Sequence, residues 1–444
     1  MARELFGTDG IRGRALEWPL DEPTMCRLGV ALTRMMAGGD PKPSFLIGGD
    51  TRASTETLAD WLSVGIQTAG GSVTWGGVLP TPAVSHLLRI GSCTAGIVIS
   101  ASHNPAEDNG VKVLASSGEK ISETVEELLE DELKRAPAAS GPGLPALRPG
   151  LLDRYRAMVI KSLEDPRPLE GLHLVLDAAN GAASGLADEI LETLGAKVTA
   201  IASTPDGMNI NRDVGAASPG QLAEAVTRLG ADGGLALDGD ADRAVLVDEK
   251  GRILDGDDLL LAWATSLFDE GRLPGNQIVA TVMSNFGLEA GLSAKGIDLV
   301  RCSVGDRAVW ETMVRSGAAL GGEQSGHIIC SHLSVTGDGL LTGTQILALA
   351  AKSGCPLSEI SDLQRLPQIL INVKVGRRRP FEEVPEIRSL LKSVGTTLAG
   401  SGRVLLRYSG TEPLARVMLE GEDKKQIHTL AEELAEAIKR ALPE

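Results

Sequence analysis

Short apolar runs that are typical of β-strands alternate with helix-like segments through most of this 444-residue chain. In the first such unit, a predicted helix over 55–69 lies between strand-like runs over 45–50 and 72–78. The same alternation recurs over 172–237 and again over 257–315. Because alternation of this kind favours sheets with parallel strands covered by helices, the sequence predicts three similar α/β domains with mixed sheets.

The closing segment has a different pattern, because its strand-like runs come before one long amphipathic helix. The predicted elements are strands over 369–375, 402–407 and 415–419 and a helix over 423–442. This pattern indicates a smaller C-terminal α+β domain. A stretch rich in proline and glycine over 136–145 indicates the first domain boundary. We place the four domains at residues 1–148, 149–251, 252–366 and 367–444.

The chain is strongly acidic, with a formal net charge of −16 at pH 7. This charge argues against a nucleic-acid partner and against an anionic membrane surface, because both are usually bound by clustered lysine and arginine. If the substrate is itself an anion, cations must be concentrated locally to hold it against the overall field of the protein.

The five cysteines are scattered and form no C-x-x-C pair, so the sequence predicts neither a disulfide framework nor a zinc site. A reducing, cytoplasmic location is the simplest prediction from this pattern. The N-terminal segment has no apolar stretch of signal-peptide length, and no run of 18 apolar residues occurs. We therefore expect a protein that is neither exported by that route nor inserted in a membrane.

A polar loop, Ser100–Pro105, directly follows the apolar run over 96–99. That run is predicted to be a buried strand, and ligands of open α/β sheets bind at the carboxyl ends of such strands. Pro105 disfavours helical backbone at the residue before it, so the loop should stay open. Ser102 is therefore placed to do chemistry, whereas Ser100 should point to the opposite face by strand alternation. The alternative is an ordinary polar turn.

Three carboxylates at alternate positions, Asp238, Asp240 and Asp242, follow a second strand-like run. Carboxylate oxygens are hard ligands, so Mg²⁺ or Ca²⁺ is the natural ion for them. An EF-hand would also use Glu249 at position 12, but Arg243 occupies position 6, where that loop requires glycine, and the flanks are strand-like. A solvated acidic turn is the remaining alternative.

Two further loops carry side chains suited to a phosphorylated sugar. Glu323, Ser325 and His327 lie in a glycine-framed loop that can approach a polyhydroxylated ligand closely. The second loop offers hydroxyl groups, backbone N–H groups in a glycine turn and two guanidinium groups, which together favour phosphate binding. Its residues are Arg407, Ser409, Gly410, Thr411 and Arg416. A structural histidine in the first loop and an ordinary surface hairpin for the second are the alternatives.

Taken in order along the chain, four motifs resemble those of the α-D-phosphohexomutase superfamily. They are Ser102-His103-Asn104-Pro105, Asp238–Arg243, Gly322–His327 and Arg407–Pro413. The resemblance covers the whole chain with one motif in each predicted domain, and it implies four domains around a central cleft. The opening Phe6–Gly13, together with Gln324 and Ser409-Gly410-Thr411, resembles more specifically the members that act on hexosamine phosphates.

The resemblance implies that Ser102 carries a phosphoryl group and that Mg²⁺ is held by this phosphoserine and the three aspartates. In the implied cycle, Ser102 phosphorylates a hexosamine 6-phosphate, the bound 1,6-bisphosphate turns over, and Ser102 takes back a phosphoryl group. Arg12, His103 and Arg243 would stabilise the charge in transfer. Either Lys112 or His327 would carry the hydroxyl proton.

Other functions share parts of this pattern. A serine-dependent phosphatase would use the same metal and phosphate sites but admit water, and a non-catalytic sugar-phosphate binding protein would keep the fold alone. Within the family, a phosphomannomutase or phosphoglucomutase is the other alternative. The joint presence of Ser102, the three aspartates and Arg407 favours an enzyme, because a binding protein would not need all of them. The resemblance also allows a homodimer.

Overall fold

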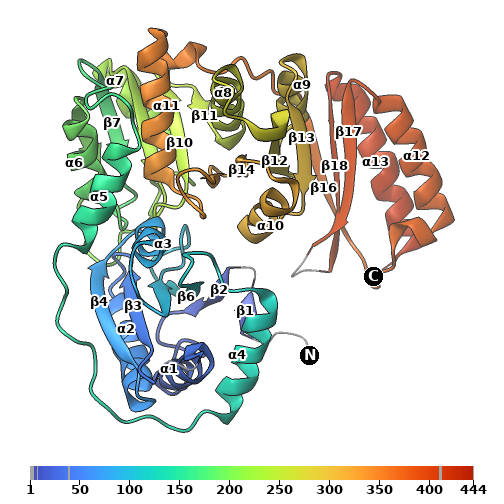
Figure 1. The fold of residues 1–444 in the computed structure, drawn as a ribbon. Helices are drawn as coiled ribbons and strands as arrows, with labels where there is room; N and C mark the ends of the chain where they lie inside the picture. The colour runs from blue at the N-terminus through green and yellow to red at the C-terminus, as the bar shows by residue number, and fades with distance from the viewer. Residues whose placement is uncertain (1–4, 8, 39–40, 410–412, 444) are drawn as a thin grey trace.

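The computed structural model describes residues 5–7, 9–38, 41–409 and 413–443. These residues form four domains, each built on its own β-sheet, and the domains follow one another in an arc from the N-terminus to the C-terminus (Figure 1). The predicted fold class, three α/β domains and a smaller C-terminal domain, is confirmed. Within the described residues, no helix combines the length and apolar character needed to cross a membrane.

The first domain has a six-stranded sheet in the order β1-β2-β6-β5-β3-β4. The apolar run that precedes the serine loop forms β5, and all five of its residues are buried. Its strands are β1 (Phe6–Gly7), β2 (Gly10–Arg14), β3 (Ser44–Gly49), β4 (Ser72–Val78), β5 (Ala95–Ile99) and β6 (Asp108–Ala115). Its helices are α1 (Glu22–Met36), α2 (Thr55–Thr68), α3 (Thr81–Arg89) and α4 (Glu123–Arg135).

The second domain has a five-stranded sheet in the order β11-β10-β9-β7-β8. The aspartate motif connects β9 to β10, so it lies at the carboxyl end of a fully buried strand. The strands are β7 (His173–Asp177), β8 (Lys197–Ile201), β9 (Gly233–Leu237), β10 (Ala244–Asp248) and β11 (Ile253–Leu254). The helices are α5 (Leu151–Lys161), α6 (Leu186–Thr193) and α7 (Gly220–Leu229).

The third domain has a four-stranded sheet in the order β13-β12-β14-β15. Its glycine-framed loop connects β14 to β15. The strands are β12 (Gln277–Thr281), β13 (Asp298–Cys302), β14 (Leu320–Gly322) and β15 (Ile328–Cys330). The helices are α8 (Gly256–Asp269), α9 (Phe286–Ala294), α10 (Asp306–Ser316) and α11 (Gly339–Ser353).

The three α/β domains repeat one strand arrangement. In each, one strand lies between two parallel neighbours that follow it in the chain: β3 between β4 and β5, β7 between β8 and β9, and β12 between β13 and β14. An antiparallel strand, β6, β10 or β15, then pairs with the last of these. The mixed sheets therefore place three corresponding loops at the same kind of sheet edge, where ligands of such folds bind.

The C-terminal domain has an antiparallel sheet in the order β16-β18-β17, covered by two helices. The sequence predicted its strands and its last helix but not α12, which packs against β17 and α13. The elements are β16 (Gln368–Lys374), α12 (Pro385–Leu398), β17 (Gly402–Tyr408), β18 (Leu414–Gly421) and α13 (Lys424–Ala441). In Figure 1 this domain lies beside the third domain and away from the sheet of the first.

Helices α1 and α2 of the first domain are packed backbone to backbone at two glycines. A Cβ atom added to Gly65 would lie 2.0 Å from the Cys26 carbonyl oxygen, and one added to Gly29 would lie 2.3 Å from the Leu62 carbonyl oxygen. Both clashes are with backbone, so a larger residue at either position must push the helices apart.

We expect Gly65→Ala to lower the free energy of unfolding by about 1–3 kcal/mol through overpacking. Differential scanning calorimetry should show its first transition several degrees below that of the wild type. Gly395→Ala is the control, because Gly395 lies inside α12 with nothing within 4 Å of the added Cβ. Alanine at this position should raise the free energy of unfolding by about 0.5–1 kcal/mol. An unchanged transition for Gly65→Ala would contradict the close-packing interpretation.

Candidate active site

Ser102 lies on the loop after β5 and faces the second domain. Its hydroxyl is fully buried and donates a hydrogen bond of 2.7 Å to Asp238 Oδ2. Ser100 lies behind the loop, where its hydroxyl donates to Asp50 Oδ2 at 2.6 Å and accepts from the Ser102 backbone N–H at 2.9 Å. The structure therefore brings Ser102, and not Ser100, to the aspartates.

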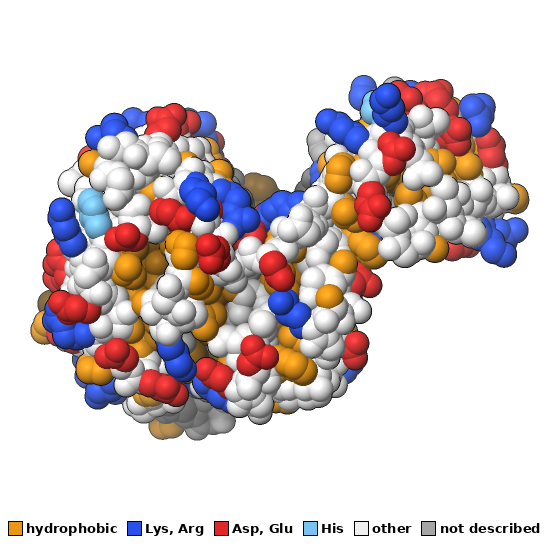
Figure 2. Space-filling model, turned by 90° about the horizontal axis from the view of Figure 1, so that it is seen from above, with side chains coloured by type: hydrophobic (Ala, Val, Ile, Leu, Met, Phe, Trp, Pro, Cys, Tyr) orange, Lys and Arg blue, Asp and Glu red, His pale blue; other side chains and the backbone are white. Residues whose placement is uncertain are grey.

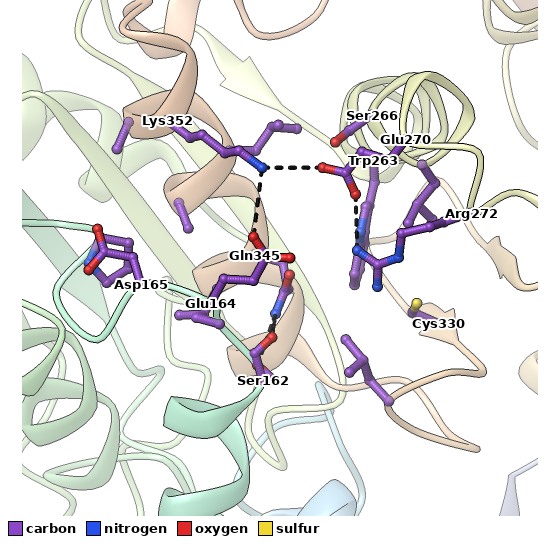
Figure 3. A pocket seen from close by; sticks show the side chains of 17 residues that line it. Ser162, Glu164, Asp165, Trp263, Ser266, Glu270, Arg272, Cys330, Gln345 and Lys352 are labelled. Atoms are coloured by element: carbon purple, nitrogen blue, oxygen red, sulfur yellow. Dashed lines mark hydrogen bonds and ion pairs between the residues drawn. The ribbon is translucent and has the colours of Figure 1, made fainter.

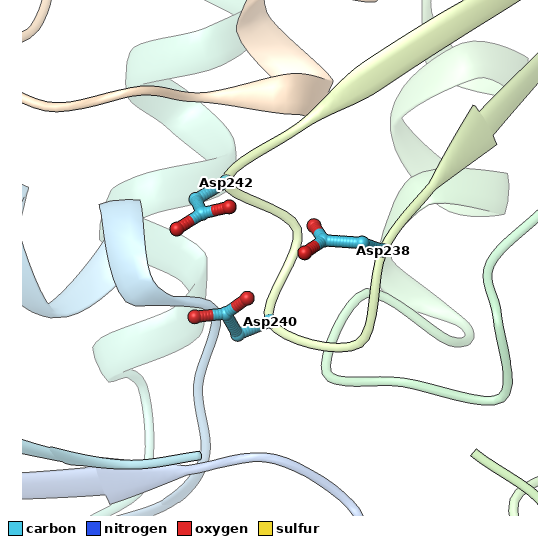
Figure 4. Close-up of side chains that lie close together, drawn as sticks. All are labelled: Asp238, Asp240 and Asp242. Carbon is cyan, nitrogen blue, oxygen red and sulfur yellow. The ribbon is translucent and has the colours of Figure 1, made fainter. Parts of the chain in front are cut away.

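Asp238, Asp240 and Asp242 converge at the carboxyl end of β9 (Figure 4). One carboxylate oxygen from each lies within 4.8 Å of the others, and all three side chains are buried. Burial, followed by the charges of Asp242 and Asp240, raises the pKa of Asp238 well above its usual value. Within the described residues, Asp240 Oδ1 and Asp242 Oδ1 have no hydrogen-bond partner. These orphaned hard oxygens fit a divalent cation such as Mg²⁺.

Lys112 supplies positive charge beside these carboxylates. Its Nζ lies 2.8 Å from Asp240, 3.3 Å from Asp242 and 3.2 Å from Asp9, while Thr81 donates to Asp240 at 2.6 Å. Although burial opposes the charge on Lys112, these carboxylates hold its pKa well above the ordinary value. Lys112 is therefore a permanent cation of the site.

His103 and two arginines line the cleft next to Ser102. Burial, followed by the charges of Arg243 and Arg12, lowers the pKa of His103 to about 4. His103 Nδ1 lies 3.3 Å from the Ser102 hydroxyl oxygen. At neutral pH the imidazole is therefore uncharged, so it can offer a hydrogen bond to the serine site while Arg12 and Arg243 supply the positive charge.

The glycine-framed loop of the third domain faces the same cleft, whose volume is about 600 Å³. Glu323 Oε1 accepts the Gly305 backbone N–H at 3.0 Å, which fixes the side chain against the start of α10. The His327 ring is buried, and within the described residues neither of its nitrogens has a hydrogen-bond partner. The predicted site residues that line this cleft are Arg12, His103, Asp242, Arg243, Glu323, Ser325 and His327.

The predicted phosphate-binding residues lie at one end of the C-terminal sheet. Arg407 and Arg416 are paired across β17 and β18, and burial together with Arg416 lowers the pKa of Arg407. Arg407 reaches to 3.9 Å from the sulfur of Met283, a cleft residue. Ser409 is buried nearby, whereas Gly410 and Thr411 lie outside the described residues. Figure 2 shows the C-terminal domain projecting from the rest of the molecule across a notch.

Three charged residues beside the cleft were not predicted from the sequence. Lys120 pairs with both Asp9 and Asp306, which joins the first domain to the third. Asp306 Oδ2 lies 4.0 Å from His327 Nε2. The sequence could have indicated Asp306 as a site residue, because it begins a predicted helix directly after a predicted strand. That position lies at the edge of the sheet where ligands bind.

A separate cavity of about 480 Å³ lies between the segment after α5 and the helices α8 and α11. Four of its charged side chains pair with one another: Lys352 with Glu164 and Glu270, and Arg272 with Glu270 (Figure 3). This cavity shares no lining residue with the cleft, and no predicted site residue lines it.

Comparison with known proteins places this architecture and cleft in one family. Four models described as phosphoglucomutase/phosphomannomutase match consecutive parts of the chain: alpha/beta/alpha domain I at residues 3–139, domain II at 153–251, domain III at 255–366 and the C-terminal domain at 370–437. The chain therefore belongs to the phosphoglucomutase/phosphomannomutase family, as the four ordered motifs predicted.

Individual relatives are similar to this chain over its full length. The phosphoglucosamine mutase of Solibacter usitatus is 44% identical over 448 residues that cover 100% of both chains. A phosphoglucomutase/phosphomannomutase family protein from Burkholderia thailandensis has a similar structure, with a TM-score of 0.83 and 25% identity over 99% of this chain and 98% of that one. The N-acetylphosphoglucosamine mutase of Aspergillus fumigatus, solved with GlcNAc-6P and magnesium, shares the fold, with a TM-score of 0.64 and 18% identity over 99% of this chain and 96% of that one.

The aspartate cluster predicts how a metal ion changes stability. Because folding raises the pKa of Asp238, the contribution of this carboxyl group to the stability of the metal-free protein should fall as the pH rises above the ordinary aspartate pKa of about 3.9. At neutral pH we therefore expect metal-free Asp238→Asn to melt at a higher temperature than the metal-free wild type. Mg²⁺ at about a hundred times its Kd should stabilise the wild type by about 2.7 kcal/mol.

Differential scanning calorimetry with EDTA or Mg²⁺ measures both effects. Asp238→Asn should show almost no response to Mg²⁺, whereas Asp298→Asn, the same change at an exposed position of β13, should respond like the wild type. Equal Mg²⁺ responses in all three proteins would rule out the cluster as the metal site.

Proposed function

We propose that the protein interconverts glucosamine 6-phosphate and glucosamine 1-phosphate through a phosphorylated Ser102. One observation carries the reaction type: the buried Ser102 hydroxyl lies 2.7 Å from a carboxylate of the three-aspartate cluster. The choice of sugar rests on the full-length relatives, which are phosphoglucosamine mutases. The product would supply UDP-N-acetylglucosamine and cell-wall precursor synthesis.

Asp238, Asp240 and Asp242, together with the phosphate on Ser102, would hold Mg²⁺. Bound there, the ion would offset the charge of about −1.5 to −2 on the phosphoserine and make its phosphorus more electrophilic. The Aspergillus enzyme with the same fold was solved with magnesium, which supports this assignment. Lys112 adds positive charge beside Asp240 and Asp242, and Arg12 and Arg243 add it in the cleft.

The proposed cycle contains two phosphoryl transfers. The 1-hydroxyl oxygen of bound glucosamine 6-phosphate attacks the phosphorus on Ser102, the phosphorus bond to the serine oxygen breaks, and the hydroxyl proton passes through a base of the cleft to the serine oxygen. The resulting 1,6-bisphosphate reorients within the cleft. The Ser102 oxygen then attacks the 6-phosphorus, which releases the 6-hydroxyl and regenerates phosphoserine with glucosamine 1-phosphate. Both steps depend on positioning and charge stabilisation.

His327 is the better placed of the two residues proposed to carry the hydroxyl proton. Its ring lines the cleft, and its nitrogens have no hydrogen-bond partner among the described residues. The Lys112 ammonium contacts three carboxylates and stays charged, so it holds the aspartates and the phosphoserine rather than accepting a proton.

The remaining residues would bind the sugar phosphate. We propose that Glu323 and Ser325 contact the sugar hydroxyls, because their loop lines the same cleft as His103. Phosphate that is not reacting would be bound by Arg407, Ser409, Gly410, Thr411 and Arg416 in the C-terminal domain. Closure of this domain over the ligand would keep water from the phosphoserine and so separate the mutase from a phosphatase.

Intact-mass measurement should detect a fraction of the purified protein that carries one phosphoryl group. Ser102→Ala should lose both this mass and measurable mutase activity, because no other hydroxyl in the loop faces the aspartates. Ser117→Ala, the same change at an exposed serine of the first domain, is the matched control and should keep the phosphoryl group. A phosphoryl group that persists on Ser102→Ala would disprove the assignment.

The proposed preference for glucosamine phosphate can be tested with two substrates. We expect kcat/KM for glucosamine 6-phosphate to exceed that for mannose 6-phosphate by more than about tenfold, which corresponds to about 1.4 kcal/mol of transition-state binding. A coupled assay of both substrates on the same preparation measures this ratio. Equal values would favour the broader phosphomannomutase/phosphoglucomutase activity.

A further inference from the structure

The backbone carbonyls of the serine loop are bound by one buried arginine. Arg52 Nη2 donates to the carbonyl oxygens of Ser102 at 3.0 Å and Asn104 at 2.8 Å. Its Nη1 donates to the carbonyl oxygen of Asp108 at 3.0 Å and also to that of Pro105. A single planar guanidinium group therefore holds the loop from its beginning to its end.

Arg52 is itself fixed from the end of β3. Its Nε donates to Asp50 Oδ2 at 2.9 Å, and both side chains are fully buried. The same carboxylate oxygen accepts the Ser100 hydroxyl, which in turn accepts the Ser102 N–H. Both ends of the Ser102 residue, its N–H and its carbonyl, are thus tied to one buried ion pair.

A second donor comes from the other domain. Asn211 Nδ2 donates to the carbonyl oxygens of Ser102 at 2.8 Å and Asn104 at 3.0 Å, the same two atoms that Arg52 Nη2 binds. A carbonyl oxygen has two lone pairs, so it can accept both donors. Gly239, which lies between Asp238 and Asp240, packs against this contact, since an added Cβ would lie 2.5 Å from the Ser102 oxygen and 2.8 Å from Asn211 Nδ2.

The conformation of Ser102 explains why so many bonds are needed. Its φ is +51°, in the left-handed region that serine rarely adopts. Such a conformation persists only when the surrounding structure imposes it. Here the imposed backbone directs the hydroxyl to Asp238, and a relaxed backbone would turn it away from the metal-binding cluster.

We propose that Arg52 and Asn211 are positioning residues for the phosphoryl transfer. Arg52 holds the serine loop within the first domain, and Asn211 ties the same carbonyls to the second domain, which carries the aspartates. The docking of the two domains thereby sets the direction of the Ser102 side chain. This inference rests on the proposed function, because it assumes that Ser102 is the residue that exchanges a phosphoryl group.

Asn211→Gly tests the proposal, because glycine keeps the left-handed backbone of Asn211 (φ +57°) and removes only the two donated hydrogen bonds. We expect kcat to fall by about tenfold to a hundredfold while KM stays within about twofold. The phosphorylation of Ser102 by glucosamine 1,6-bisphosphate, followed by intact mass, should slow by the same factor. The thermal midpoint should stay near that of the wild type.

Asn180→Gly is the matched control. Asn180 has a similar backbone (φ +50°) and belongs to the same domain, but its amide donates to the carbonyl of Asn209 rather than to the serine loop. It should keep the wild-type kcat. Arg52→Lys keeps a cation beside Asp50 but cannot bind carbonyls on two sides, so its kcat should fall at least as far as that of Asn211→Gly.

A wild-type kcat in Asn211→Gly, or equal losses in Asn211→Gly and Asn180→Gly, would overturn the proposal. Absence of turnover in the wild type would instead contradict the proposed function, so the two failures are distinguishable.

Discussion

The buried contact between Ser102 and Asp238 is the interaction on which the rest of the site depends. It joins two domains through a hydroxyl group and a carboxylate whose charge is unfavourable in the absence of a cation. Three buried carboxylates at one sheet edge are stable only if positive charge surrounds them. Lys112 fills part of this need from the first domain, and the orphaned oxygens of Asp240 and Asp242 leave room for a metal ion.

The same constraint resolves the mismatch between an acidic protein and an anionic substrate. The net charge of −16 repels a sugar phosphate at long range, but salt screens fields beyond about 8 Å at physiological ionic strength. Within that distance the cleft presents Arg12 and Arg243, with Arg407 reaching toward it from the C-terminal domain. The cleft also contains the carboxylates of Asp9, Asp242, Asp306 and Glu323, so a sugar phosphate would have to meet the guanidinium groups directly and not a uniformly positive surface.

The sequence predicted most of this arrangement because each loop follows a buried strand. The runs that end at Ile99 and Leu237 are short, apolar and bounded by polar residues, so both the strands and the loops after them could be identified. The domain boundaries and the roles of the site residues stay predictions. The sequence did not predict helix α12. The order of this domain, one strand, a helix, two strands and a last helix, differs from the βα alternation of the first three domains.

Residues that act through long-range contacts could not be predicted in this way. Arg52 lies fifty residues before the loop that it holds, and Asn211 lies in another domain, 109 residues after Ser102. Neither belongs to a local pattern, because their importance comes from the backbone carbonyls that they meet in space. The distance between Lys120 and Asp306 along the chain hides their ion pair in the same way.

The C-terminal domain is attached to the third domain at one end of its sheet, which leaves the other end free to adjust to a ligand. Arg403 donates to the Ser284 carbonyl at 2.7 Å, and buried Glu420 accepts the Phe286 N–H at 3.0 Å, so this end of β17 and β18 is fixed to the third domain. Ser409 lies beyond the opposite end of β17, about 20 Å along the strand from Arg403. A rotation of about 10° about the fixed end would move the end that carries Arg407 and Ser409 by about 3 Å. In the cycle proposed above, the first three domains would keep the serine and the aspartates in register while the proposed phosphate anchor adjusts to either orientation of the bisphosphate.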